Sequence, residues 1–160
     1  EEVFTIPKSK LMKSGARVMS LQEPESKMSK SSEDPKGTID LLDKPDVVRE
    51  KIMSAVTDTG KEIIAKPEKA GITNLLTIYS VVSDQSIQDL EEKYQGRGYG
   101  EFKKDLAEVV VEFLRPIQEK YSEIRDDEDY LNQVLKDGLA KAKPMSESIL
   151  EKVHKSMGLG

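Results

Sequence analysis

Residues 99–121, YGEFKKDLAEVVVEFLRPIQEKY, carry the apolar pattern that decides the fold. Apolar side chains recur there three or four positions apart, at Phe102, Leu106, Val109, Val110, Phe113, Ile117 and Tyr121. This spacing places them on one face of an α-helix. Pro116 lies inside the pattern without ending it, so we expect one long helix that is kinked there. The chain is therefore expected to be mainly α.

Two helices are predicted before this segment. The first starts near Pro45, a residue that favours the first helical position, and its apolar stripe continues through Thr57. A loop with glycine and proline breakers follows at residues 58–71, and the second helix covers residues 73–82. The apolar residues of the two stripes are Val48, Ile52, Val56, Leu75, Leu76, Tyr79 and Val82.

A short surface helix is predicted next, capped by Ser83 or Asp84 and ended by Gly96. Residues 127–157 then fit either one long helix interrupted near Pro144 or two consecutive helices, and we favour one bent helix. The chain contains no repeats, so the helices need one another to bury their apolar stripes. Residues 45–157 are therefore expected to form a helical bundle.

The first forty residues have a different pattern. Val3–Ile6 and Arg17–Leu21 are short, partly β-branched and followed by prolines, which suits strands or extended segments. Residues 1–38 carry seven basic and six acidic side chains, whereas the remainder carries eighteen basic and twenty-four acidic ones. The net charge of −5 argues against nucleic-acid binding that relies on bulk positive potential.

Composition limits the chemistry further. The 160 residues contain no cysteine and one histidine, so disulfides, thiolate metal sites and multi-histidine sites are excluded, and no protein-ligated metal is expected. No apolar run approaches the roughly 20 residues that span a bilayer. We therefore expect a soluble, cytoplasmic protein without a membrane partner.

Lys27-Met28-Ser29-Lys30-Ser31 is the motif with the clearest chemistry. Two flexible ammonium groups three residues apart, among small hydroxyl side chains, suit a polyphosphate that moves during a reaction. Pro24 on one side and residues 34–37 on the other break regular structure, which indicates a surface loop. From these five residues alone, a solvated turn remains the alternative.

The flanks of this loop distinguish the two interpretations. Residues 15–24 (GARVMSLQEP) and 38–43 (TIDLLD), together with the loop, resemble the class I aminoacyl-tRNA synthetases and specifically the bacterial tryptophanyl-tRNA synthetases. The resemblance continues through SAVTD at 54–58, NLLTIY at 74–79, GYGEFK at 98–103, LRPI at 114–117 and MGLG at 157–160. The related tyrosyl enzymes fit less well, because their loop usually departs from this sequence.

One signature of the family has no counterpart here. The family carries a histidine-containing turn near the start of its nucleotide-binding fold, and the single histidine of this chain is His154. The chain therefore resembles the C-terminal half of such an enzyme, Glu1 is not expected to be a natural start, and the fragment alone is expected to be inactive.

The resemblance implies an organisation and an activity. Residues 1–40 would be the end of a Rossmann-like catalytic domain, and residues 41–160 a helical anticodon-binding region whose last helix can pack back on that domain. The intact enzyme would activate L-tryptophan with ATP and transfer it to tRNA(Trp), with Mg²⁺ bound to the ATP. It would be a homodimer through the missing N-terminal part.

The same resemblance implies site residues. Lys27 and Lys30 would be catalytic through the charge that develops on phosphate oxygens. The ATP-binding residues would be Val18, Lys27, Met28, Ser29, Lys30 and Ser31. No tRNA-contacting side chain can be named. A non-catalytic helical module that binds RNA or a protein partner is the alternative function, and the length of the family match argues against it.

Three other patterns are interpreted as structural. Residues 96–100 (GRGYG) lack a preceding strand and the full dinucleotide fingerprint, so an interhelix turn is expected. His154 is expected on a solvated helix face. The acidic run at 126–129 lacks the spacing of a calcium loop and is expected at a helix N-terminus, where carboxylates are favoured.

Overall fold

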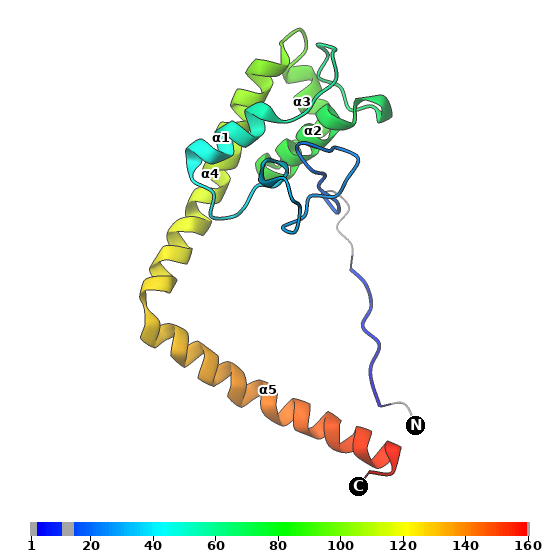
Figure 1. Cartoon of the computed structure of the whole chain (residues 1–160), viewed down its shortest axis with the longest axis vertical. Helices are drawn as coiled ribbons and strands as arrows, with labels where there is room; N and C mark the ends of the chain where they lie inside the picture. Colours follow the sequence, from blue (N-terminus) through cyan, green and yellow to red (C-terminus); the bar gives the residue numbers. More distant parts are fainter. Residues whose placement is uncertain (1–2, 11–14, 160) are drawn as a thin grey trace. The chain divides into compact units, whose positions relative to one another are not determined.

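The computed structural model describes residues 3–10 and 15–159. The helices, in chain order, are η1 (Pro35–Gly37), α1 (Pro45–Ser54), η2 (Pro67–Lys69), α2 (Ala70–Ser83), α3 (Ile87–Lys93), α4 (Tyr99–Asp126) and α5 (Glu128–Met157), of which η1 and η2 are single 3₁₀ turns (Figure 1). The described residues form no regular β-strand. The predicted mainly α fold is confirmed.

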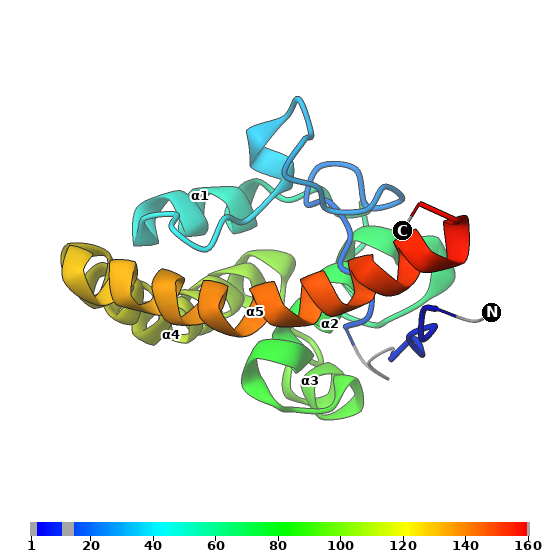
Figure 2. The same cartoon turned by 90° about the horizontal axis from the view of Figure 1, so that it is seen from below.

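The chain divides into two compact units. One comprises Leu11–Gln118, and the other comprises Glu1–Lys10 together with Glu119–Gly160. The first unit therefore contains both the lysine loop and the helices α1, α2 and α3, which lie close together with the first part of α4 in two perpendicular views (Figures 1 and 2). The division near residue 40 into a catalytic and a helical part stays a prediction.

Of the two alternatives predicted near the N-terminus, strands or extended segments, no strand forms in the described residues. Neither Val3–Ile6 nor Arg17–Leu21 is part of a sheet, and the only bridge in the described residues is an isolated antiparallel one between Met19 and Lys27. A strand needs a neighbouring strand to satisfy its backbone groups. In the described part of the chain, the residues around Lys27 are the only ones that form a β-bridge with the segment around Met19, and they form a single one.

The core of the first unit is built from all four of its helices. Its largest fully buried side chains are aromatic: Tyr79 on α2, Tyr94 just after α3 and Phe102 on α4. The ring centroids of Tyr94 and Phe102 lie 5.1 Å apart with the rings nearly perpendicular, a favourable edge-to-face arrangement. The hydroxyl of Tyr94 donates a 2.8 Å hydrogen bond to Asp105. The aromatic cluster thus joins α2, α3 and α4.

The start of α3 differs from the prediction. The cap is Ser86, because its hydroxyl accepts from the amide of Asp89 and the Asp89 carboxylate accepts from the amide of Ser86. Ser83 and Asp84 end the preceding helix instead, where Asp84 adopts a left-handed conformation with φ of 56°. The helix is short, as predicted, and buries Leu90 and the following Tyr94.

The long helix is confirmed, with Pro116 inside it, but only part of its predicted stripe is buried. The buried face ends at Leu114, whereas Phe113, Ile117 and Tyr121 are exposed. The core formed by the described residues contains no residue beyond Leu114, and the expected bundle of residues 45–157 stays a prediction. Helical periodicity identifies an apolar face, but it does not show whether the chain supplies a partner for that face.

The last helix is a single one, as favoured, with Pro144 inside it. Asp127 caps it by accepting from the amide of Tyr130 at 2.9 Å, which confirms the interpretation of the acidic run as a helix start. Gly158 ends the helix in a left-handed conformation with φ of 73°. No residue of α5 is buried. Among the described helices, none combines the length and apolarity that a membrane span requires.

Candidate functional site

The lysine loop begins on a short backbone ladder. The amide of Met28 donates to the carbonyl oxygen of Val18 at 3.1 Å, and the amide of Ser20 donates to the carbonyl oxygen of Ser26 at 2.8 Å. A turn between Glu23 and Ser26 closes this pair of segments. The ladder therefore brings Val18 beside Met28, two positions that the sequence assigned to one ATP site by resemblance.

The tip of the loop is a tight turn built on Ser29. Its carbonyl oxygen accepts from the Thr38 hydroxyl at 3.0 Å and from the Ser32 amide at 3.1 Å. Its hydroxyl oxygen lies 3.0 Å from that of Ser31. Thr38 is buried, so the turn is attached to the body of the unit and not only to its own ends.

The charged side chains of the loop face solvent. Lys27, Lys30 and Ser31 are exposed, whereas Val18, Met28 and Ser29 are half-buried. Among the ion pairs of the described residues, none includes Lys27 or Lys30. The nearby Lys36, in contrast, pairs with Glu50 at 3.2 Å. The structure thus presents two accessible ammonium groups on a tied backbone, an arrangement that can bind phosphate oxygens.

The side chains of Val18 and Met28 have a packing role. Both pack against the core, together with Ile39, and they line an apolar cavity of about 150 Å³ with residues of α2 and α4. Their half-buried side chains therefore contribute to packing.

A second set of contacts holds the segment that precedes the loop. Asn74 on α2 accepts from the amide of Met19 at 2.9 Å and donates to the carbonyl oxygen of Met19 at 2.8 Å. Leu21 donates to the carbonyl oxygen of Gly37 at 2.9 Å and accepts from the amide of Val56 at 2.8 Å. The loop is thereby connected to α2 and to the chain that follows α1.

The role of Asn74 was not predicted, although Asn74 belongs to one of the segments that carry the family resemblance. A signal was present in the sequence. Asn74 carries the one side-chain amide of a helix in which apolar residues predominate, and it directly precedes Leu75 and Leu76. A buried amide in such a place requires hydrogen-bond partners. The sequence could not identify Met19 as that partner, because 55 positions separate the two residues.

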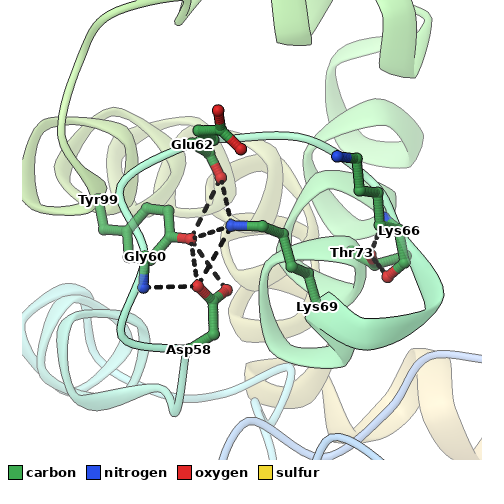
Figure 3. A network of polar contacts seen from close by, with 7 residues as sticks. All are labelled: Asp58, Gly60, Glu62, Lys66, Lys69, Thr73 and Tyr99. Carbon is green, nitrogen blue, oxygen red and sulfur yellow. Dashed lines mark hydrogen bonds and ion pairs between the residues drawn. The ribbon is translucent and has the colours of Figure 1, made fainter.

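A polar network lies where α2 and α4 begin (Figure 3). The ammonium group of Lys69 donates to Asp58 at 3.2 Å and to the phenol oxygen of Tyr99 at 3.1 Å. Burial opposes ionisation of Asp58, but hydrogen bonds from Tyr99, the Gly60 amide and Lys69 outweigh it and lower the pKa of this carboxyl. The hydrogen bond with Tyr99, opposed by burial, raises the pKa of Lys69. The network keeps the ion pair charged.

The described residues contain no group of three or more histidine, cysteine, aspartate or glutamate side chains placed to hold a metal ion.

Comparisons with known proteins agree on one family. Residues 1–115 match the model of the tRNA synthetases class I (W and Y). The chain is 49% identical over 160 residues to the tryptophan--tRNA ligase of Bacillus subtilis, which covers 99% of the chain and 48% of that protein. It is 50% identical over 159 residues to the enzyme of the same name from Bacillus anthracis. The chain thus spans about half the length of the curated relatives it matches.

Solved structures show the same fold. The tryptophanyl-tRNA synthetase from Mycoplasma pneumoniae superimposes with a TM-score of 0.83 at 30% identity, over 93% of this chain and 45% of that one. The enzyme from Campylobacter jejuni, complexed with ADP and tryptophan, gives a TM-score of 0.69 at 29% identity, over 98% of this chain and 48% of that one.

Proposed function

The chain belongs to the class I tRNA synthetases (W and Y), and from this premise we propose that it serves as part of a tryptophan--tRNA ligase. In the proposed reaction the carboxylate of L-tryptophan attacks the α-phosphorus of ATP and forms a new oxygen–phosphorus bond. The bond to pyrophosphate breaks, and pyrophosphate leaves. A hydroxyl group at the 3′ end of tRNA(Trp) then attacks the carbonyl carbon of the adenylate and loses its proton, an ester bond forms, and AMP leaves.

Lys27 and Lys30 supply charge in this proposal. Both side chains are exposed on a turn that Thr38 and the ladder to Val18 hold in place, and this is the observation that carries the proposal. Negative charge builds on the phosphate oxygens as pyrophosphate leaves. An ammonium group that approaches those oxygens more closely in the transition state than in the ground state lowers the barrier.

The other loop residues have a binding role in the proposal. Ser29 and Ser31 offer small hydroxyl groups, and Val18 and Met28 contribute backbone groups, since their side chains pack inward. Mg²⁺ would arrive as part of the substrate, bound to ATP oxygens and to water. Ser29, at the tip of the loop, has a small side chain, so that a phosphate group can approach the backbone there.

The remaining assignments follow from the family. Residues 1–40 are proposed as the end of a Rossmann-like catalytic domain and residues 41–160 as a helical anticodon-binding region. The exposed apolar stripe of α5 suits a helix that packs on another part of a longer protein. We propose a cytoplasmic homodimer whose dimer contacts lie outside this chain.

The test is ATP–pyrophosphate exchange in the full-length gene product. Lys27→Ala and Lys30→Ala should each lower the exchange rate by roughly 10²- to 10³-fold, the effect of removing one preorganised charge-stabilising group. Lys36→Ala is the matched control, because it removes a nearby lysine that pairs with Glu50. Unchanged adenylate formation in both loop variants would remove their catalytic assignment.

Two further arms test the wider proposal. Exchange should depend on tryptophan and not on tyrosine. The 160-residue chain alone should show no exchange, since it spans about half of its relatives. A full-length protein that binds RNA without any exchange would instead support the non-catalytic helical module.

A further inference from the structure

We infer that Asn74 is a positioning residue for the lysine loop. Its side-chain amide fixes the backbone at Met19, the residue that forms the antiparallel bridge with Lys27. The inference deepens the proposed function, on which its kinetic part rests. Its structural part concerns the placement of the loop and stands on the contacts of Asn74 alone.

The amide of Asn74 takes the place of a neighbouring strand. Met19 lies between Val18 and Ser20, whose backbone groups bond to Met28 and Ser26 on one edge of the segment. Successive residues of an extended chain direct their backbone groups to opposite edges, so Met19 directs its own groups to the other edge. There the Asn74 side chain satisfies both of them, at 2.9 and 2.8 Å.

This pairing acts on Lys27 through one residue. Met19 and Lys27 form the antiparallel bridge, so any shift of Met19 relative to α2 shifts the residue on which the first lysine stands. Because Asn74 forms hydrogen bonds with both backbone groups of Met19, it fixes the register of residues 18–20 relative to α2 as well as the distance of Met19 from that helix. If the segment slipped by one residue, Asn74 would lie beside a residue whose backbone groups point toward the ladder, and it could not bond to them.

The polar atoms of the Asn74 side chain are engaged by Met19. This side chain is 5% exposed, and its carbonyl oxygen and amino group are both committed to Met19. It lies between the fully buried Ile72 and Leu75, where an amide without partners would be costly. The residue therefore acts through Met19 and belongs to the support of the site, not to its reacting groups.

The helix that carries Asn74 is itself held against the same segment. A Cβ atom added at Gly71 would lie 2.3 Å from the carbonyl oxygen of Val56, so α2 approaches the backbone there closely. The amide of Val56 in turn donates to the carbonyl oxygen of Leu21. Two ties, one from Asn74 and one from Val56, thus connect the start of α2 with residues 19–21.

The test uses Asn74→Leu, which removes both hydrogen bonds and keeps a side chain of similar size, and Asn74→Asp, which keeps only the acceptor. Thr77→Val is the matched control. Thr77 lines the same cavity as Asn74, one turn further along α2, but its hydroxyl bonds only to the carbonyl oxygen of Thr73 in its own helix. The Asn74 and Thr77 substitutions therefore all perturb α2, but only the Asn74 substitutions remove hydrogen bonds to Met19.

The first readout is amide hydrogen exchange, followed by NMR in the full-length gene product. The amides of Ser20 and Met28 should exchange about tenfold faster or more in Asn74→Leu, and less so in Asn74→Asp, because the ladder opens locally. Both amides should be unaffected in Thr77→Val. The amide of Leu106, in the core of α4, reports whether the fold is intact in all three variants.

The second readout is kinetic and uses the full-length gene product. Asn74→Leu should lower kcat of ATP–pyrophosphate exchange on the order of 10- to 100-fold, as expected when a catalytic group is displaced by about 1 Å. The KM for tryptophan should not change. Because a loss of folded protein would also lower the apparent kcat at an unchanged KM, kcat is calculated per folded protein, with the folded fraction of each variant measured by circular dichroism.

The outcomes separate the two proposals. Equal rates of amide hydrogen exchange at Ser20 and Met28 in Asn74→Leu and Thr77→Val would overturn the inference. Faster amide hydrogen exchange in Asn74→Leu with an unchanged kcat would overturn it as well. If these amides become faster while the wild-type full-length protein shows no ATP–pyrophosphate exchange at all, the proposed function fails and the placement of the loop by Asn74 is retained.

Discussion

The phenol oxygen of Tyr99 lies 2.9 Å from both carboxylate oxygens of Asp58, although the two residues are 41 positions apart in the sequence (Figure 3). Lys69 donates to both groups, so a carboxylate, a phenol and an ammonium group share one site. The contact ties the loop after α1 to the first residue of α4. The stability of this junction should therefore depend on the charge of Asp58.

Asp58→Asn should weaken the dependence of stability on acid pH. The hydrogen bonds overcome burial and hold the folded-state pKa of Asp58 below its ordinary value of 3.8. The carboxylate therefore stabilises the fold above that value, and this contribution is lost as pH falls through the folded-state pKa. Urea unfolding between about pH 5 and pH 2 should show a steeper loss of stability in the wild type than in the variant. Parallel profiles would contradict the assigned shift.

Lys103 gives the opposite test at high pH. Its ammonium group is buried, forms no ion pair with a carboxylate of the described residues, and donates to the carbonyl oxygen of Ala55 at 2.7 Å. Burial lowers the pKa of Lys103 below 10.5. Between the lowered value and 10.5 the unfolded chain binds more protons, so stability rises with pH in this window.

The wild type should accordingly gain stability relative to Lys103→Met as pH rises from about 8 towards the ordinary lysine pKa of about 10.4. Lys104→Met is the matched control for the loss of a positive charge, since Lys104 is the exposed neighbour on the same helix. Chemical denaturation at several pH values measures the three proteins. A constant difference between wild type and Lys103→Met would refute the expectation.

These contacts also show what the sequence could predict and what it could not. Local periodicity was sufficient for α1, α2 and α4, because an apolar stripe is a property of neighbouring residues. The Lys27–Ser31 motif could likewise be assigned to a surface loop, since Pro24 and the turn residues after it are local signals. The partners of buried polar groups are not local. Asn74 with Met19, Tyr99 with Asp58, and Lys103 with Ala55 each join segments that only the fold brings together.

The aromatic cluster offers a graded test of the core. Phe102→Ala should lower the free energy of unfolding by about 3–5 kcal/mol, because it leaves a cavity beside Tyr79 and Tyr94. Tyr94→Phe should lower it by about 1–2 kcal/mol, since it keeps the ring but removes the hydrogen bond to Asp105. Tyr121→Phe, at an exposed position, should change it by less than about 0.5 kcal/mol. Equal effects of the three substitutions would contradict this core.

Gly71 and Gly100 provide a matched pair in which the same substitution should act in opposite directions. Both lie in the first turn of a helix, where alanine is intrinsically favoured over glycine. A Cβ atom at Gly100 meets nothing within 4 Å, so Gly100→Ala should raise the free energy of unfolding by up to about 1 kcal/mol.

At Gly71 the added Cβ atom would lie 2.3 Å from the backbone carbonyl oxygen of Val56, which cannot yield as the end of a flexible side chain can. Gly71→Ala should therefore lower the free energy of unfolding by about 1–3 kcal/mol despite its better helix propensity. Because Val56 also donates to Leu21, the substitution should speed amide exchange at Ser20 as well. A stabilising Gly71→Ala would show that α2 does not approach Val56 this closely, and it would remove one of the two ties that hold the lysine loop.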